Sequence, residues 1–158
     1  MTVNEAIIQT QGSKPGFINR RSADYAQTLL EPGEAVTAAV VANIFTRREH
    51  FPGVVVLTDR HILAVCGLPG IRRRIICDLE RLDKCVEKPT AITYSASFAA
   101  GENAFSMTID PDTGEKFSQR IAILRSGTGK EKGRVGYADP KAIAARLAAE
   151  LAAEENKK

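Results

Sequence analysis

Seven short runs rich in β-branched and small residues, each closed by turn residues, fill most of the chain after residue 34. Valine and isoleucine dominate the first four runs, as expected of side chains that pack well on a pleated surface. The links between them are short, such as Thr58-Asp59 and Leu68-Pro69-Gly70, and a parallel crossover would need a dozen or more residues. The runs cover residues 35–45, 53–58, 60–66, 72–79, 91–98, 104–110 and 116–124. The sequence therefore predicts seven antiparallel strands.

We expect the strands to form two sheets, because the longer link over residues 80–90 lets the chain pass from one sheet to another. Residues 91–98 and 104–110 alternate apolar and polar side chains, which is typical of a sheet with one buried and one solvated face. In the last link, Asp110-Pro111-Asp112-Thr113-Gly114, the glycine is expected to close a hairpin.

The first predicted sheet is apolar on both faces. If Val40 and Ile44 face the core, Val41 and Phe45 face outward. One explanation is that an N-terminal arm folds over the outer face with Ile7, Ile8, Phe17 and Ile18. The other is that this face is a self-association surface, because large exposed apolar patches usually mark interfaces.

Helices are predicted on both sides of the strands. A short helix begins near the N-cap candidate Ser22 and stops before Pro32-Gly33. A longer helix begins at Asp139 and Pro140, with an apolar stripe at every fourth residue from 143 to 151, and is expected to cap the sheet. We accordingly predict an N-terminal arm (1–22), one domain (23–155) and a tail (156–158).

Composition excludes several classes of protein. With 158 residues, 44% hydrophobic and 26% charged, the chain is neither disordered nor too short for a core. Three cysteines do not form the dense, even set of a secreted disulfide scaffold, and the N-terminus lacks the apolar run of a signal peptide. No transmembrane segment is expected either. These features favour the cytoplasm.

Three segments resemble bacterial pleckstrin-homology-like (PH-like) domains. They are the pre-strand motif at residues 29–34 (LLEPGE), the tight hairpin at 54–63 (VVVLTDRHIL), and the fourth strand with its continuation at 76–86 (ICDLERLDKCV). The resemblance extends over about residues 29–151. It implies a mainly β, α+β barrel of seven antiparallel strands in two sheets, capped by a C-terminal amphipathic helix. It also implies a binding or assembly module without an active site of its own.

Basic residues gather on two predicted links that antiparallel parity places at the same end of the first sheet. An anionic headgroup or an acidic peptide would suit such a rim. The alternative is a solvated hairpin tip whose charges prevent edge aggregation, since Glu49 dilutes the field and strand alternation sends Arg73 away from its two neighbours. The candidate ligand-binding residues are Arg47, Arg48, His50, Arg72, Arg73 and Arg74.

Motifs for other chemistry are incomplete. Histidines and cysteines show no zinc-type spacing, and the glycine-rich segment 126–130 lacks the glycine and hydroxyl residue of a phosphate-binding loop. We therefore expect no catalytic residue, no metal, no cofactor and no nucleic-acid partner. The expected partner is a protein or an anionic ligand, with peripheral membrane contact or a homo-oligomer left open. Two alternatives remain, a self-assembling scaffold domain and an unrecognised enzyme whose nearest acidic group is Asp78, Glu80 and Asp83.

Overall fold

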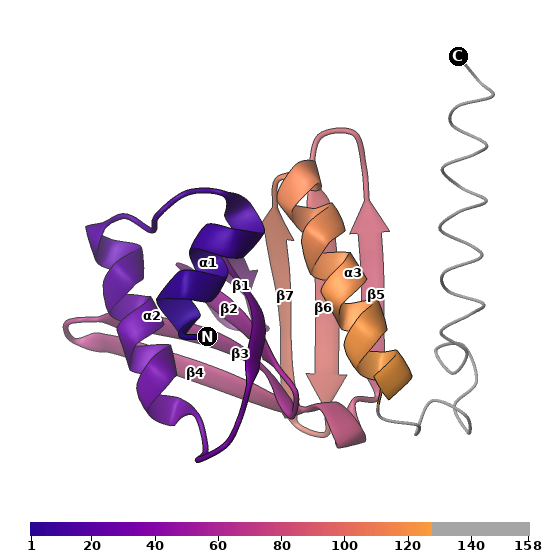
Figure 1. The fold of residues 1–158 in the computed structure, drawn as a ribbon, viewed down its shortest axis with the longest axis horizontal. Coiled ribbons are helices and arrows are strands. Elements are labelled where there is room, and N and C mark those ends of the chain that lie inside the picture. The colour runs from indigo at the N-terminus through magenta and orange to yellow at the C-terminus, as the bar shows by residue number, and fades with distance from the viewer. Residues whose placement is uncertain (128–158) are drawn as a thin grey trace. The chain divides into compact units, whose positions relative to one another are not determined.

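The computed structural model describes residues 1–127 (Figure 1). The chain divides into two compact units, of which the first, Met1–Ser118, contains all the described strands and the second begins at Gln119. The elements are α1 (Val3–Gln11), α2 (Phe17–Leu29), β1 (Val36–Phe45), β2 (His50–Thr58), β3 (His61–Leu68), β4 (Ile71–Asp78), the 3-10 turn η1 (Leu79–Arg81), β5 (Lys84–Pro89), β6 (Tyr94–Ala100), β7 (Asn103–Ile109) and α3 (Pro111–Gly127). The prediction of a mainly β fold with seven antiparallel strands followed by a helix is confirmed.

The strands form one sheet rather than the two that we expected. Its order is β4-β3-β2-β1-β7-β6-β5, and all the neighbouring strands are antiparallel. The junction between β1 and β7 consists of three residue pairs, which involve Asn43, Ile44 and Phe45 of β1. The long link was thus correctly identified as the place where the chain leaves the first four strands, but hydrogen bonds still join the two halves.

Two of the expected strand assignments were wrong. Residues 116–124, which were expected to form the seventh strand, belong to α3 instead. The strand that completes the set of seven is β5, which lies inside the expected link over residues 80–90. Asp110 precedes α3 and accepts a hydrogen bond from the backbone N–H of Thr113 at 3.0 Å, which is N-cap geometry. This bond and one from the Thr113 side chain hold the pKa of Asp110 below its usual value.

Gly114 closes no hairpin. It lies in the first turn of α3 against the buried ring of Tyr94, where an added Cβ would come within 2.3 Å of the ring's Cγ. The Tyr94 hydroxyl donates to the Glu87 carboxylate, and burial together with that charge strongly raises the tyrosine pKa. β6 begins at Tyr94 rather than at residue 91 as expected, so Ile92 lies in the preceding turn and is 87% exposed.

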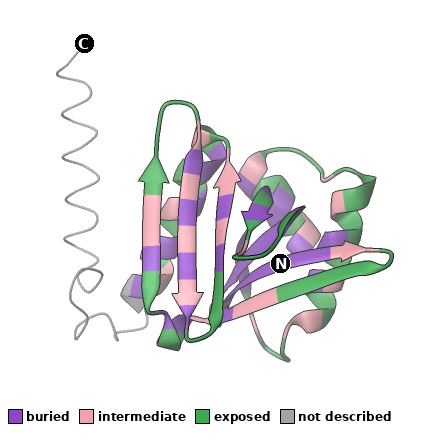
Figure 2. Ribbon diagram, turned by 180° about the vertical axis from the view of Figure 1, so that it is seen from behind, coloured by how far each residue is buried: buried purple, intermediate pink, exposed green. Residues whose placement is uncertain are grey.

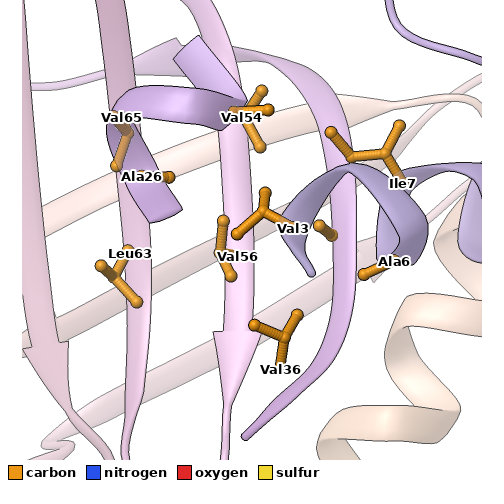
Figure 3. Close-up of a cluster of buried hydrophobic side chains, with 11 residues drawn as sticks. Val3, Ala6, Ile7, Ala26, Val36, Val54, Val56, Leu63 and Val65 are labelled. Atoms are coloured by element: carbon orange, nitrogen blue, oxygen red, sulfur yellow. The ribbon is translucent and has the colours of Figure 1, made fainter. Parts of the chain in front are cut away.

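Helices α1 and α2 cover the first three strands, so the apolar outer face has its explanation within the chain (Figure 1). Their apolar side chains meet those of β1, β2 and β3 in a cluster whose members are at most 5% exposed (Figure 3). α2 can approach β3 closely because Gly67 has no side chain. A Cβ at this position would lie only 2.9 Å from the Arg21 carbonyl oxygen. The cluster consists of Val3, Ala6, Ile7, Ala23, Ala26, Val36, Ala39, Val54, Val56, Leu63 and Val65. The part of the outer face that lies under α1 and α2 is therefore a core.

Side chains of α1 also accept hydrogen bonds from backbone N–H groups on part of the β1 edge. N-terminal to Asn43, β1 has no strand partner on its β7 side among the described residues. There the backbone N–H groups of Ala39 and Val41 donate to the Thr10 hydroxyl at 3.4 Å and to Gln11 Oε1 at 3.1 Å. Because buried backbone donors must be paired, these two side chains help fix α1 on the sheet.

The motif at residues 29–34 is bound to the β2–β3 hairpin. Thr58 and the backbone N–H of Glu31 donate to the Glu34 carboxylate, and His61 Nδ1 lies 2.7 Å from it. The Glu34 side chain is 1% exposed, and burial alone would raise its pKa. The hydrogen bonds and His61 outweigh burial, so the net effect is a lowered pKa.

The helix expected from Asp139, which was to cap the sheet, lies outside the described residues. The proposed boundaries at residues 22 and 155 remain predictions. Among the described helices, none has the length and apolar character that a membrane span requires.

Candidate functional site

An open cleft of about 770 Å³ lies where two connections and the strand β4 approach one another. Its lining comes from the β1–β2 link with the start of β2, from the middle of β4, and from the β6–β7 turn. The lining residues are Thr46, Arg47, Arg48, Glu49, Phe51, Arg73, Arg74, Ile75, Gly101, Glu102, Asn103 and Ala104. Four arginines and two glutamates therefore border the same space.

Four of the six predicted ligand-binding residues meet at this cleft: Arg47, Arg48, Arg73 and Arg74. Arg47 and Arg48 have no ion-pair partner among the described residues, and neither does Arg74. Arg73 is paired, with its Nε 2.8 Å from Glu49 Oε1. The dilution by Glu49 expected from the sequence is thus realised at one of the four arginines.

The other two predicted residues are not in the lining. Arg72 lies on the opposite face of β4, where its guanidinium carbon is 5.0 Å from the centre of the Tyr25 ring in α2. Arg72 and Arg73 thus make contacts on opposite faces, as expected from strand alternation, whereas Arg74 borders the same cleft as Arg73. His50 stacks on Phe45, with ring centroids 4.6 Å apart and planes 4° from parallel. Its imidazole is therefore engaged with β1.

The β6–β7 turn is the part of the site that the sequence did not predict. It brings Glu102 and Asn103 to the cleft, and the Cys77 thiol donates to the Asn103 carbonyl oxygen at 3.5 Å. This contact ties the end of β4 to the turn across the curled sheet. No local sequence signal marks it, because it depends on how far the sheet bends.

The burial of the cysteines and the grouping of residues that could hold a metal bear on the chemistry that the described residues can support. Cys66, Cys77 and Cys85 are buried, as expected, and form no disulfide among the described residues; burial raises the pKa of the Cys77 thiol to about 11. A thiol with such a pKa is protonated at neutral pH and is a poor nucleophile. In the part of the chain that the structure describes, no three His, Cys, Asp or Glu side chains are grouped to hold a metal ion.

Comparison with known proteins supports the fold. No protein-family model matches the sequence, and no curated protein matches it. A solved structure, the Vps36 N-terminal PH domain, is similar with a TM-score of 0.50 over 63% of this chain and 86% of that one. The two sequences are 13% identical, so the similarity shows a PH-like fold and leaves the ligand open.

Proposed function

We propose that this protein is a non-catalytic, intracellular binding module that holds an anionic ligand in the arginine-lined cleft. The observation that carries the proposal is the convergence of Arg47 and Arg48 from the β1–β2 link, and of Arg73 and Arg74 from β4, onto one cleft. Guanidinium groups bind carboxylates and phosphates through charge-assisted, often bidentate hydrogen bonds. A PH-like fold, which is generally a binding module, supports the same reading. Three cysteines that form no disulfide among the described residues suit a reducing compartment such as the cytoplasm.

The arginines differ in what they offer a ligand. Arg73 is held by Glu49, so an anion at this position must compete with an existing carboxylate. Arg47 and Arg48 lie on an exposed link without such competition. We therefore expect these two residues to contribute most of the attraction, and Arg73 to contribute after Glu49 is displaced.

The test is titration calorimetry with inorganic tripolyphosphate as the probe. The full chain should bind it, and affinity should fall as salt rises, because exposed charges are screened. The variant Arg47→Glu/Arg48→Glu should bind about tenfold more weakly or worse, since the link then repels the anion. Parallel titrations with vesicles that carry phosphorylated lipid headgroups distinguish a lipid source of phosphate from a free one.

A matched control makes the same change in charge at another place. Lys84→Glu/Lys88→Glu reverses two exposed positive charges on β5, which does not contribute to the cleft lining. This control should bind like the wild type. Equal weakening in both variants would show that net charge alone drives binding, and the cleft would lose its role.

A further inference from the structure

β4 is an end strand of the sheet, and its outer edge has no strand partner among the described residues. On the inner side all eight of its residues pair with β3 in an unbroken register from Ile71 to Asp78. Residues 71–74 are exposed, as the view from behind shows (Figure 2). An end strand presents unpaired backbone N–H and C=O groups and is a template for one more strand.

The opposite end of the sheet is protected in a way that β4 is not. β5 is six residues long, ends at Pro89, and carries Lys84 and Lys88. Proline lacks an N–H group, and short, lysine-bearing edges resist further pairing. β4 is longer, contains no proline and shows no register shift. Its edge is the one suited to accept a strand.

The charges of β4 decide which strand it can accept. Arg73 is on the cleft face and Arg72 is on the other face, over the Tyr25 ring, while Arg74 also borders the cleft. If two copies paired through residues 71–74 in an antiparallel arrangement centred on Arg73, arginine would lie opposite arginine, and like charges directly opposite are destabilising. A strand with acidic side chains would instead meet cations on both faces.

We propose that the exposed half of β4 receives an extended acidic segment of another protein, which adds an eighth strand to the sheet. The inference rests on the proposed function and names its ligand class. Backbone hydrogen bonds to the β4 edge would supply affinity, and the arginines would select for acid, as is typical of recognition by strand addition. Side chains that point to the cleft face would meet Arg73 and the neighbouring Arg47 and Arg48.

The experiment uses the full chain and two synthetic octapeptides of alternating glutamate and threonine. One is unmodified, and the other carries methyl groups on its four central backbone nitrogens, which keeps its charge but blocks strand pairing. Binding is followed by NMR, and hydrogen exchange of the β4 amides is measured in parallel. We expect the methylated peptide to bind at least about tenfold more weakly, since it lacks the backbone bonds. Outward-facing amides of residues 71–75 should gain protection only with the unmodified peptide.

Variants identify the edge that is used. Arg72→Glu, which is outside the cleft lining, should weaken peptide binding, and Lys88→Glu, the same charge change on β5, should leave it unchanged. The Arg72→Glu variant should retain tripolyphosphate binding through the unchanged cleft arginines, which separates this inference from the proposed function.

Several results would overturn the inference. Equal binding of the two peptides would mean electrostatic capture without strand addition, and absence of peptide binding would remove the acidic segment as ligand. Preference for phosphatidylserine vesicles over the peptide would make a membrane the partner. Protection of β4 amides that grows with protein concentration alone would make it a second copy. In each of these cases, tripolyphosphate binding that depends on Arg47 and Arg48 would leave the proposed function standing.

Discussion

At the scale of the residue, two of the segments that resemble PH-like domains are joined to each other by hydrogen bonds that stabilise the fold. Glu34 lies in one motif and Thr58 and His61 in another, and the fold brings them into a single hydrogen-bonded group. Glu31 and Arg60 of the same motifs form an ion pair of 3.0 Å, but both side chains are substantially exposed. The sequence predicted that these motifs mattered for the fold. It could not show that they contact each other, because that pairing depends on β1 returning alongside the hairpin.

We predict that Glu34→Gln lowers the free energy of unfolding at neutral pH by about 1–3 kcal/mol, because a buried, hydrogen-bonded charge is lost. The lowered pKa of Glu34 sets the sign of the pH effect. Its contribution is fully present above the ordinary value of 4.5 and is lost as pH falls through the folded-state pKa. Urea unfolding from neutral pH to about pH 3 should therefore show a smaller loss of stability for the variant than for the wild type.

Glu31→Gln is the control, since it makes the same chemical change three residues earlier at an exposed ion pair. Its effect should stay within about 1 kcal/mol. Equal destabilisation by both changes would contradict a special role for Glu34.

At the scale of the element, the sequence predicted strands reliably where valine and isoleucine are dense and turns are tight. β2, β3 and β4 begin and end within three residues of their predicted bounds. β5 was missed because Lys84, Glu87, Lys88 and Pro89 make an edge strand look like a loop. A strand at the end of a sheet needs few apolar residues, so composition does not reveal it.

α3 was assigned as a strand although its helical signals were present. Asp110-Pro111 is the same N-cap and first-turn pair that predicted a helix at residues 139–140, and the buried residues Thr113, Phe117 and Ile121 recur every four positions. The wrong assignment came from Gly114, because a glycine shortly after Pro-Asp is typical of a hairpin turn. Its actual role is to let the helix backbone approach Tyr94.

Gly114→Ala should therefore destabilise the protein by about 1–3 kcal/mol, the usual cost of overpacking. Alanine favours a helix by about 1 kcal/mol over glycine, but the Cβ contact at 2.3 Å with the Tyr94 ring outweighs that gain. A double-mutant cycle with Tyr94→Leu checks the cause by thermal unfolding. The cost of the alanine should largely vanish in the leucine background; an unchanged cost would assign it to the helix itself.

At the scale of the whole molecule, antiparallel parity predicted most of the candidate site. The β1–β2 and β3–β4 links had to lie at the same end of the sheet, and the structure brings Arg47, Arg48, Arg73 and Arg74 together there. The contribution of the β6–β7 turn could not be predicted, since it follows from curvature and from the contact between Cys77 and Asn103. The N-terminal residues form helices that cover the sheet, but of the four side chains expected to do so only Ile7 is buried. Ile8, Phe17 and Ile18 are 40%, 75% and 53% exposed.

The helix layer can be tested with two adjacent isoleucines of α1. Ile7 is fully buried against the sheet, and Ile8 is 40% exposed. Ile7→Ala should lower the free energy of unfolding by about 2–5 kcal/mol, as for other buried isoleucines, while Ile8→Ala should cost less than about 1 kcal/mol. Urea unfolding measures both. Similar small effects would mean that α1 is not part of the cooperative fold.

The covering of early strands by α1 and α2 also bears on how the protein is made. Ribosomes deliver the N-terminus first, at roughly 5–20 residues per second, so α1 emerges several seconds before the segment that contains Val65. Until then, Val3 and Ile7 have no β3 to complete their native surroundings. A nascent chain thus exposes apolar side chains during that interval. Exposed apolar segments of this kind are what chaperones at the ribosome exit bind.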